Sequence, residues 1–322
     1  MTLEELLPLL WHQLGWPLLR LLVFICLGLL VANLIESLSW TERLATLARP
    51  FTRWGRLSPT AEASFSLSFF SSLAANTMLA EAFDQGRMTR RELICASLLN
   101  TLPTYVLHLP TTFFIAAPLI GRAALPYLGL TLGAALLRSL VVLLVGRCIL
   151  PHHDRGQTPA PVQAPPGTGG FRAALHKSWQ RFRRRIGKVL RFTLPIYLLF
   201  FLLQRLGIFG VLEKGMADHL AFLSWLSPQA MSIVMLQLVA EFTAGVAAAG
   251  ALLQDGLSQR EVVLALLAGN ILSSPIRAIR HQFPYYAGIF PPRLALELIV
   301  YSQGFRAFSM ILVTAAYLLT DP

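Results

Sequence analysis

The chain has 322 residues, of which 55% are hydrophobic and only 13% charged, and its mean hydropathy is +0.60. A soluble globular domain carries roughly 25% charged residues, so the composition excludes an ordinary soluble enzyme. Three scattered cysteines exclude a disulfide-built scaffold. The formal net charge of +11 is therefore expected to report on membrane topology rather than on nucleic-acid binding. These features predict an all-α polytopic membrane protein.

Several segments are long enough to cross a bilayer core of about 30 Å, which needs roughly 20 apolar helical residues. The predicted spans are residues 16–38, 93–121 and 125–145 in the first half of the chain, and 192–210, 262–290 and 294–319 in the second. The stretch 93–121 contains Pro103, Pro110 and Pro118 and is too long for one straight crossing. We therefore expect it to form a broken helix.

A hydrophilic region separates the two halves. Residues 151–170 are rich in proline and glycine and are predicted to form a flexible linker. Residues 171–191 follow with many arginines, and their apolar side chains recur at spacings of three and four. This pattern favours a basic amphipathic helix on the anionic inner leaflet over a nucleic-acid patch. Anionic lipids are thus one expected partner, and nucleic acid is not.

The two halves share landmarks in the same order. The shift between them stays between 168 and 171 residues along the following matches: Arg20 with Arg191, Leu57-Ser58-Pro59 with Leu226-Ser227-Pro228, Arg91-Glu92 with Arg260-Glu261, Asn100 with Asn270, and Arg138 with Arg306. One shared tripeptide would be chance, but five ordered landmarks indicate an internal repeat.

The positions of arginine clusters predict the membrane topology of each repeat. They flank residues 61–83 on both sides, so a crossing there would place one cluster outside, against the positive-inside bias. We therefore expect 61–83, and its equivalent 230–252, to be re-entrant hairpins with turns at 71–76 and 241–245. Each repeat then has three membrane helices, one of them broken, plus a hairpin, and the second repeat is inverted. This topology keeps 20 of the 27 Lys and Arg residues inside with the linker, and the acidic N-terminus lies outside.

The segment SFFSSLAANTMLAEAFDQGRMTRRELICASLLNTLPTYVLHLP, beginning at Ser68, carries a small polar turn, a basic loop and a helix broken near Asn and Pro. It resembles the Gate, or nucleoside-recognition, domain of concentrative nucleoside transporters, ferrous iron transporter B and spore maturation proteins. The resemblance implies a first Gate-like repeat over 1–150 and a second, inverted one over 192–322, with a substrate site or pore between them. Positions where the iron transporter-like members carry cysteines are Ser71, Ser72, Asn100 and Pro103 here, which weakens an iron-conducting interpretation.

Charged residues inside the predicted spans are candidate ligand contacts. Arg138 and Arg306 occupy equivalent places in the last span of each half. A charge near the bilayer centre costs at least about 2.5–3.5 kcal/mol and usually faces a cavity or a partner. The two arginines are predicted either to neutralise an anionic substrate or headgroup, or to pair with structural carboxylates. The candidate carboxylates are Glu36, Glu62, Glu81 and Glu241.

Uncharged polar residues gather at the predicted helix breaks and hairpin turns. At such places they bind ligand or cap freed backbone groups, and Glu241 is a candidate coupling-ion site or arginine counter-ion. The predicted substrate-binding set is Ser71, Ser72, Asn76, Asn100, Thr104, Arg138, Glu241, Thr243, Asn270, Ser273, Ser274, Arg277 and Arg306.

No nucleotide-binding loop, hydrolase elbow or zinc-protease motif occurs in the sequence. We expect no enzymatic activity, no cofactor and no resident metal. The favoured hypothesis is a secondary transporter or flippase of the bacterial cytoplasmic membrane that moves a small polar or anionic solute, either nucleoside-like or phosphate-bearing. A non-transporting envelope assembly protein and an ion pore are the alternatives. A homodimer is possible, although the repeat means that one chain can complete the site.

Overall fold

The computed structural model describes residues 54–151, 225–240 and 242–320 continuously, together with isolated positions among residues 11–52 and 175–183. Within these residues every regular element is helical and there is no strand. The predictions for the first span (16–38), the linker (151–170), the basic helix (171–191) and the span 192–210 concern segments outside the continuously described residues, as does Glu241.

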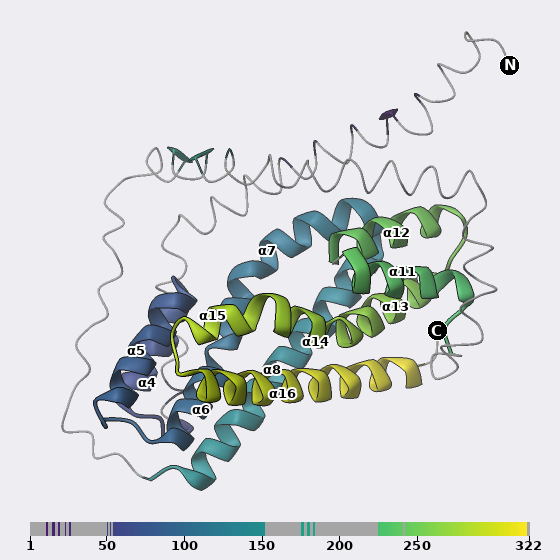
Figure 1. Ribbon diagram of the computed structural model, residues 1–322. Helices are drawn as coiled ribbons and strands as arrows, with labels where there is room; N and C mark the ends of the chain where they lie inside the picture. The colour runs from purple at the N-terminus through teal and green to yellow at the C-terminus, as the bar shows by residue number, and fades with distance from the viewer. Residues whose placement is uncertain are drawn as a thin grey trace, which may run out of the picture.

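The first half of the described chain begins with a helical hairpin. Its elements in order are α4 (Pro59–Ser68), α5 (Ser72–Asp84), α6 (Arg90–Leu99), α7 (Thr101–Ile120), a 3-10 turn η2 (Gly121–Ala123) and α8 (Ala124–Ile149). Figure 1 shows the α4–α5 hairpin at one end of the molecule and α7 and α8 leading away from it.

The second half repeats this order. Its elements are α11 (Pro228–Ala240), α12 (Phe242–Gln254), α13 (Gln259–Leu272), α14 (Ser274–Arg277), the π-helical η4 (Ala278–Gln282), α15 (Phe283–Ala287) and α16 (Pro292–Leu319). The segment from α14 to α15 occupies the place that the single helix α7 has in the first half. Short π-helical segments such as the one within it frequently occur at functional sites.

Local sequence explains why equivalent helices start where they do. Thr89 caps α6 by accepting from the backbone N–H of Glu92, and Ser258 caps α13 by accepting from that of Glu261. Both pairs have the Ser/Thr-x-x-Glu spacing of a capping box. In the first half the Glu92 carboxylate also accepts from the backbone N–H of Ser58 at 2.9 Å, which joins the start of α4 to the start of α6.

The predicted break in residues 93–121 lies at Asn100. Helix α6 ends at Leu99 and α7 begins at Thr101, because Pro103 has no N–H to donate to the carbonyl one turn earlier. Pro110 and Pro118 lie inside α7 without ending it, as membrane helices tolerate when neighbouring groups satisfy the freed carbonyls.

The predicted hairpin turn at 71–76 was placed too late. The chain turns at residues 69–71, and Ser72 already begins α5. The reason is local: the Ser71 hydroxyl accepts from the backbone N–H of Ala74 and so acts as the N-cap of α5. In the second half α11 ends at Ala240 and α12 begins at Phe242, so Thr243 falls inside α12.

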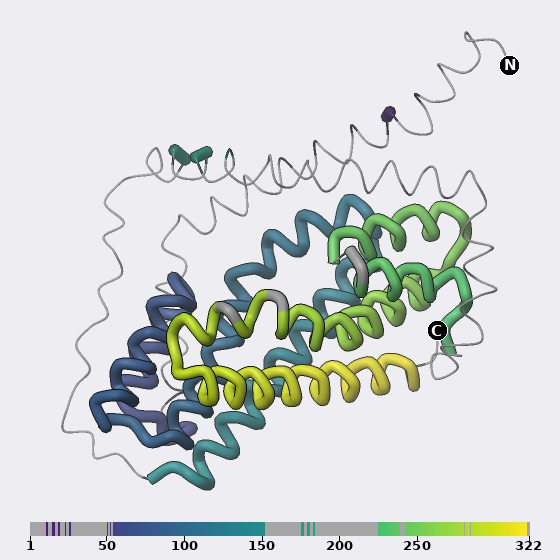
Figure 2. The backbone as a smooth tube through the Cα atoms, in the orientation of Figure 1, coloured from purple at the N-terminus to yellow at the C-terminus, as the bar shows by residue number. Residues whose placement is uncertain are grey.

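The buried side chains form two hydrophobic clusters. The α4–α6 cluster contains the first hairpin, α6, the end of α8, α15 and the start of α16. The α11–α13 cluster contains the second hairpin, α13, the end of α7, the start of α8 and Met310 of α16. Helix α8 thus runs from the α11–α13 cluster to the α4–α6 cluster, whereas α16 crosses in the opposite direction, as the tube in Figure 2 shows.

By length and composition, two helical stretches among the described residues are able to cross a membrane: residues 90–149, which contain α6 to α8, and residues 292–319, which form α16. Large apolar side chains stay exposed along α8 and α16, among them Leu136, Leu140, Val300, Phe308 and Ile311. An apolar exterior of this kind suits contact with lipid.

Helices α12 and α7 cross closely at Gly250, and this contact gives a stability prediction. A Cβ atom added at Gly250 would lie 2.6 Å from the backbone oxygen of Leu119. We expect Gly250→Ala to lower the free energy of unfolding by about 1–3 kcal/mol, since the two backbones must separate. Thermal unfolding of the purified protein measures the effect.

The matched control for this substitution is Gly304→Ala in α16, where nothing lies within 4 Å of the added Cβ. It should keep or raise stability, because alanine is favoured over glycine within a helix by about 1 kcal/mol. Equal melting temperatures for the two variants would contradict the close crossing.

Candidate functional site

A cavity of about 390 Å³ lies between the two hydrophobic clusters. It is bounded by α5, α6 and α7, by α8 and α16, and by α13, η4 and α15. Most of the side chains that line it carry a polar group: Ser72, Asn76, Ser97, Asn100, Thr101, Thr104, Tyr105, His108, Thr131, Ala135, Arg138, Asn270, Gln282, Tyr285, Tyr286, Ser302, Gln303, Arg306 and Met310.

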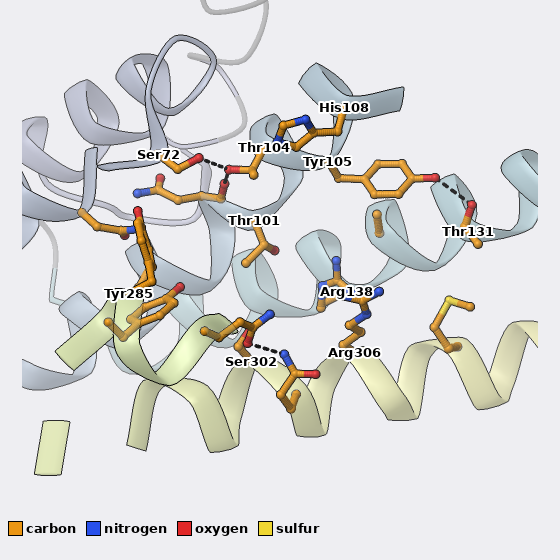
Figure 3. A pocket seen from close by; sticks show the side chains of 18 of the residues that line it. Ser72, Thr101, Thr104, Tyr105, His108, Thr131, Arg138, Tyr285, Ser302 and Arg306 are labelled. Carbon is orange, nitrogen blue, oxygen red and sulfur yellow. Dashed lines mark hydrogen bonds between the residues drawn. The ribbon is translucent and has the colours of Figure 1, made fainter. Parts of the chain in front are cut away.

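The two arginines predicted from the sequence meet in this cavity. Arg138 lies on α8 and Arg306 on α16, each between the segments that its helix contributes to the two clusters. Figure 3 shows their side chains together in the middle of the lining, and their positive charges act on each other. Arg138 is only 9% exposed, and its Nε atom is buried without a hydrogen-bond partner.

Arg306 is held by an amide rather than by a carboxylate. Its Nη2 atom donates to Asn270 Oδ1 at 2.9 Å. The same oxygen accepts from Arg277 Nη2 at 2.9 Å, and Arg277 also donates to the Asn270 backbone oxygen at 2.9 Å. The Asn270 Nδ2 atom in turn donates to the hydroxyl of buried Tyr127 at 3.1 Å. One neutral side chain therefore fixes two guanidinium groups without neutralising either.

No carboxylate within the described residues forms an ion pair with Arg138 or Arg306. Of the carboxylates considered from the sequence, Glu81 accepts from Gln85 on the exposed side of α5 at 3.0 Å. Glu62 is buried near the start of α4. Glu36 and Glu241 lie outside the described residues. Among the described residues that line the cavity there are thus two arginines and no aspartate or glutamate.

The end of the cavity nearest α5 is uncharged. Thr104 Oγ1 donates to the Asn100 backbone oxygen at 2.9 Å. Because that uses its only proton, the Ser72 hydroxyl donates in the 2.7 Å contact between the two side chains. Asn76 Nδ2 donates to the Tyr285 hydroxyl at 3.2 Å, and Asn100 Nδ2 donates to Ser64 at 2.8 Å. The Oδ1 atoms of both asparagines are buried without a donor.

The structure brings together part of the predicted binding set. Residues that line the cavity are Ser72, Asn76, Asn100, Thr104, Arg138, Asn270 and Arg306.

The remaining predicted residues lie elsewhere. Arg277 is not among the lining residues, but it donates to Asn270 Oδ1, the oxygen that also accepts from Arg306. Ser274 bonds Gln303, which itself lines the cavity. Ser273 ends α13 and bonds the Asn270 backbone oxygen. Ser71 is occupied as a helix cap, and Thr243 lies within α12, away from the lining.

Sequence reasoning missed several lining residues. Ser302 and Gln303 precede Arg306 by four and three positions, so they share its face of α16, and this spacing was a usable signal. Tyr105 lies one turn after Thr101, and its hydroxyl bonds Thr131 at 2.7 Å. Tyr285 and Gln282 had no such signal, because the π-helical segment changes the helical register on which face assignments depend.

Comparisons with known proteins give relatives without an assigned role. The chain is 25% identical to uncharacterized protein MJ0871 of the archaeon Methanocaldococcus jannaschii over 94% of this chain and 93% of that protein. It is 24% identical to uncharacterized protein MJ1556 of the same organism, over 91% of this chain and 90% of that protein. No protein-family model and no solved structure matches the chain significantly. The resemblance to Gate-type domains therefore stays a prediction.

Proposed function

We propose that the chain is a multi-pass protein of the cytoplasmic membrane whose two halves are inverted repeats. Three observations support this proposal: the helices of the two halves follow the same order, α4 and α11 begin 169 residues apart at Pro59 and Pro228, and the equivalent helices α8 and α16 run in opposite directions between the two clusters. Inverted repeats related by an axis in the membrane plane have this arrangement.

The topology can be tested at two equivalent loop positions. Gln85 and Gln254 lie 169 residues apart at the exposed ends of α5 and α12. In a background without Cys26, Cys95 and Cys148, we expect Gln85→Cys to react with an impermeant thiol reagent only from the cytoplasmic side and Gln254→Cys only from the outside. Labelling of sealed and inverted vesicles measures this. Labelling of both from one side would contradict the inverted repeat.

We further propose that the protein is a secondary transporter or flippase, not an enzyme, that carries an anionic solute through the cavity. One observation carries the proposal: Arg138 and Arg306, from the long apolar helices α8 and α16, meet in a cavity in which no described lining residue is a carboxylate. Burying two such charges in a membrane is costly, and a bound anion would offset that cost. The position of the cavity between two clusters suits a site that is reached from alternate sides.

Counterflow in proteoliposomes tests the transport proposal. Vesicles are loaded in turn with inorganic phosphate, glycerol phosphate, a nucleotide, a nucleoside and a dicarboxylate, and uptake of the labelled solute is followed. We expect one anionic class to accumulate with the native protein, and the Arg138→Gln/Arg306→Gln double variant to fall to the level of protein-free vesicles.

The matched control is Arg122→Gln, which removes one positive charge from an exposed position between α7 and α8 and should keep full uptake. Equal uptake by the double variant and the native protein, or no uptake of any class by well-folded native protein, would contradict the transporter. The second result would favour the envelope assembly protein.

A further inference from the structure

We infer that the ligand of this cavity is a phosphate monoester of a small hydroxylated molecule. This inference rests on the proposed function and names the substrate class of the same site. It follows from the way in which the cavity is divided into a cationic part around Arg138 and Arg306 and an uncharged part around Ser72 and Thr104 (Figure 3).

The cationic part is matched to a doubly charged anion. Two guanidinium groups line the cavity, and a third, Arg277, repels Arg306 from behind Asn270. A singly charged carboxylate or phosphodiester would leave one lining cation uncompensated. A phosphate monoester carries between one and a half and two negative charges at neutral pH and presents three acceptor oxygens, enough for two planar forks of N–H donors at once.

The uncharged part is matched to hydroxyl groups. Asn76 and Asn100 line it, and each keeps a carboxamide oxygen without a donor; a ligand hydroxyl would supply that donor. An ammonium group would also donate, but a desolvated ammonium needs an opposite charge, and no aspartate or glutamate is found among the described residues that line this cavity. Thr104, which donates to the Asn100 backbone oxygen, and Ser72, which contacts Thr104, extend this polar surface.

The size of the cavity limits the rest of the ligand. At about 390 Å³ it lies near the lower end of the range of about 300–1,000 Å³ for small-molecule sites. A phosphorylated polyol or sugar fits this description better than a larger dinucleotide.

Equilibrium binding to the purified, delipidated full-length protein tests the inference. The probes are glycerol phosphate, propyl phosphate, inorganic sulfate and succinate. We expect glycerol phosphate to bind at least about tenfold more tightly than propyl phosphate, which lacks the hydroxyl groups, because polar groups built to pair with them stay unsatisfied. Asn76→Ala should reduce this preference, and Arg138→Gln should weaken both phosphate esters. Tightest binding of succinate, or equal binding of both esters, would overturn the inference.

The pH dependence provides an independent readout. The second ionisation of a phosphate monoester lies near pH 6, so the affinity for glycerol phosphate should rise about tenfold between pH 5 and pH 7.5. The titratable and charged groups facing this position are Arg138, Arg306, Tyr105, Tyr285, Tyr286 and His108. Of these side-chain types, only an unperturbed histidine changes charge in this range, and a positive charge on His108 would act in the opposite direction. The charge of sulfate is constant in this range, so the pH dependence of sulfate binding gives the contribution of the histidine. Identical pH profiles of affinity for sulfate and glycerol phosphate would contradict the phosphate assignment.

The phosphate group could belong to a soluble ester or to a lipid headgroup, and competition separates the two sources. Displacement of glycerol phosphate by vesicles containing phosphatidic acid, but not by vesicles of phosphatidylcholine alone, identifies a headgroup; the absence of displacement identifies a soluble ester. If another anion class binds and is transported, the phosphate inference fails while the transporter stands. If no anion binds and none is transported, both fail.

Discussion

Replacing Arg138 by leucine is expected to stabilise the purified protein while abolishing its affinity for anions. The Arg138 side chain is 9% exposed, and its Nε atom has no hydrogen-bond partner. A charge in this environment costs at least about 2.5–3.5 kcal/mol, and leucine removes that cost without leaving a buried donor unpaired. The melting temperature should rise by several degrees, and the binding of anionic solutes should fall to background.

Two further variants control this prediction. Arg306→Leu removes the same charge but also deprives Asn270 Oδ1 of a donor, so its gain in stability should be smaller. Arg122→Leu changes an exposed position outside the cavity and should alter neither quantity appreciably. A lower melting temperature for Arg138→Leu would show that this guanidinium has a compensating partner outside the described residues.

Replacing Asn270 by aspartate should also give a more stable protein, with a lower affinity for anions. The Asn270 Oδ1 atom already accepts from Arg277 and Arg306, both at 2.9 Å. A carboxylate in the same place turns both contacts into ion pairs, in which donor and acceptor are charged and the hydrogen bonds are stronger than those to a neutral amide. It also supplies the cavity with a permanent internal anion. We expect a higher melting temperature and an affinity for the ligand at least about tenfold lower, since one cation is no longer available.

Asn270→Leu is the matched control for this charge reversal. Its side chain has the same branching at Cγ but forms no hydrogen bond, so Arg306, Arg277 and the Tyr127 hydroxyl lose a common partner. Stability should fall by several kcal/mol, as unpaired buried donors cost about 1–3 kcal/mol each and more when they are charged. If the aspartate variant unfolded as readily as the leucine variant, Arg306 would not be an uncompensated cation.

Both expected results have one physical basis: a binding site that keeps charge uncompensated is less stable than the same site without that charge. Substitutions that remove such a charge commonly stabilise a protein at the expense of its activity. The Gly250 crossing behaves differently, because tight packing there supports the fold and has no part in the cavity.

The strongly apolar elements were predictable from the sequence. The predicted spans 125–145 and 294–319 correspond to α8 and α16 with a few residues added at their ends. Each prediction rested on a long apolar run, whose length in a helix is set by the bilayer. Arg138 and Arg306 could be matched from the sequence, because their spacing of 168 residues is close to the shift between the other landmarks that the two halves share.

The parts that depend on tertiary contacts were not predictable. The sequence places Asn270 at a helix break, but its role as the shared acceptor of Arg277 and Arg306 arises from the packing of α13 against α16. The turn after α4 was misplaced because Ser71 and Ser72 both suit a cap, and only the contact of Ala74 with the Ser71 hydroxyl distinguishes them. Tyr285 lines the cavity and follows the π-helical segment 278–282 in the chain. No periodicity in the sequence predicts that segment.

The way in which α8 and α16 each belong to both hydrophobic clusters constrains how the molecule can move. Neither cluster can shift as a rigid block without carrying one end of each long helix with it. Sliding one cluster past the other would break packing along both helices, whereas a tilt of the clusters about the middle of α8 and α16 would disturb it least. Arg138 and Arg306 are located at that middle, so a ligand held by them would move little during such a tilt.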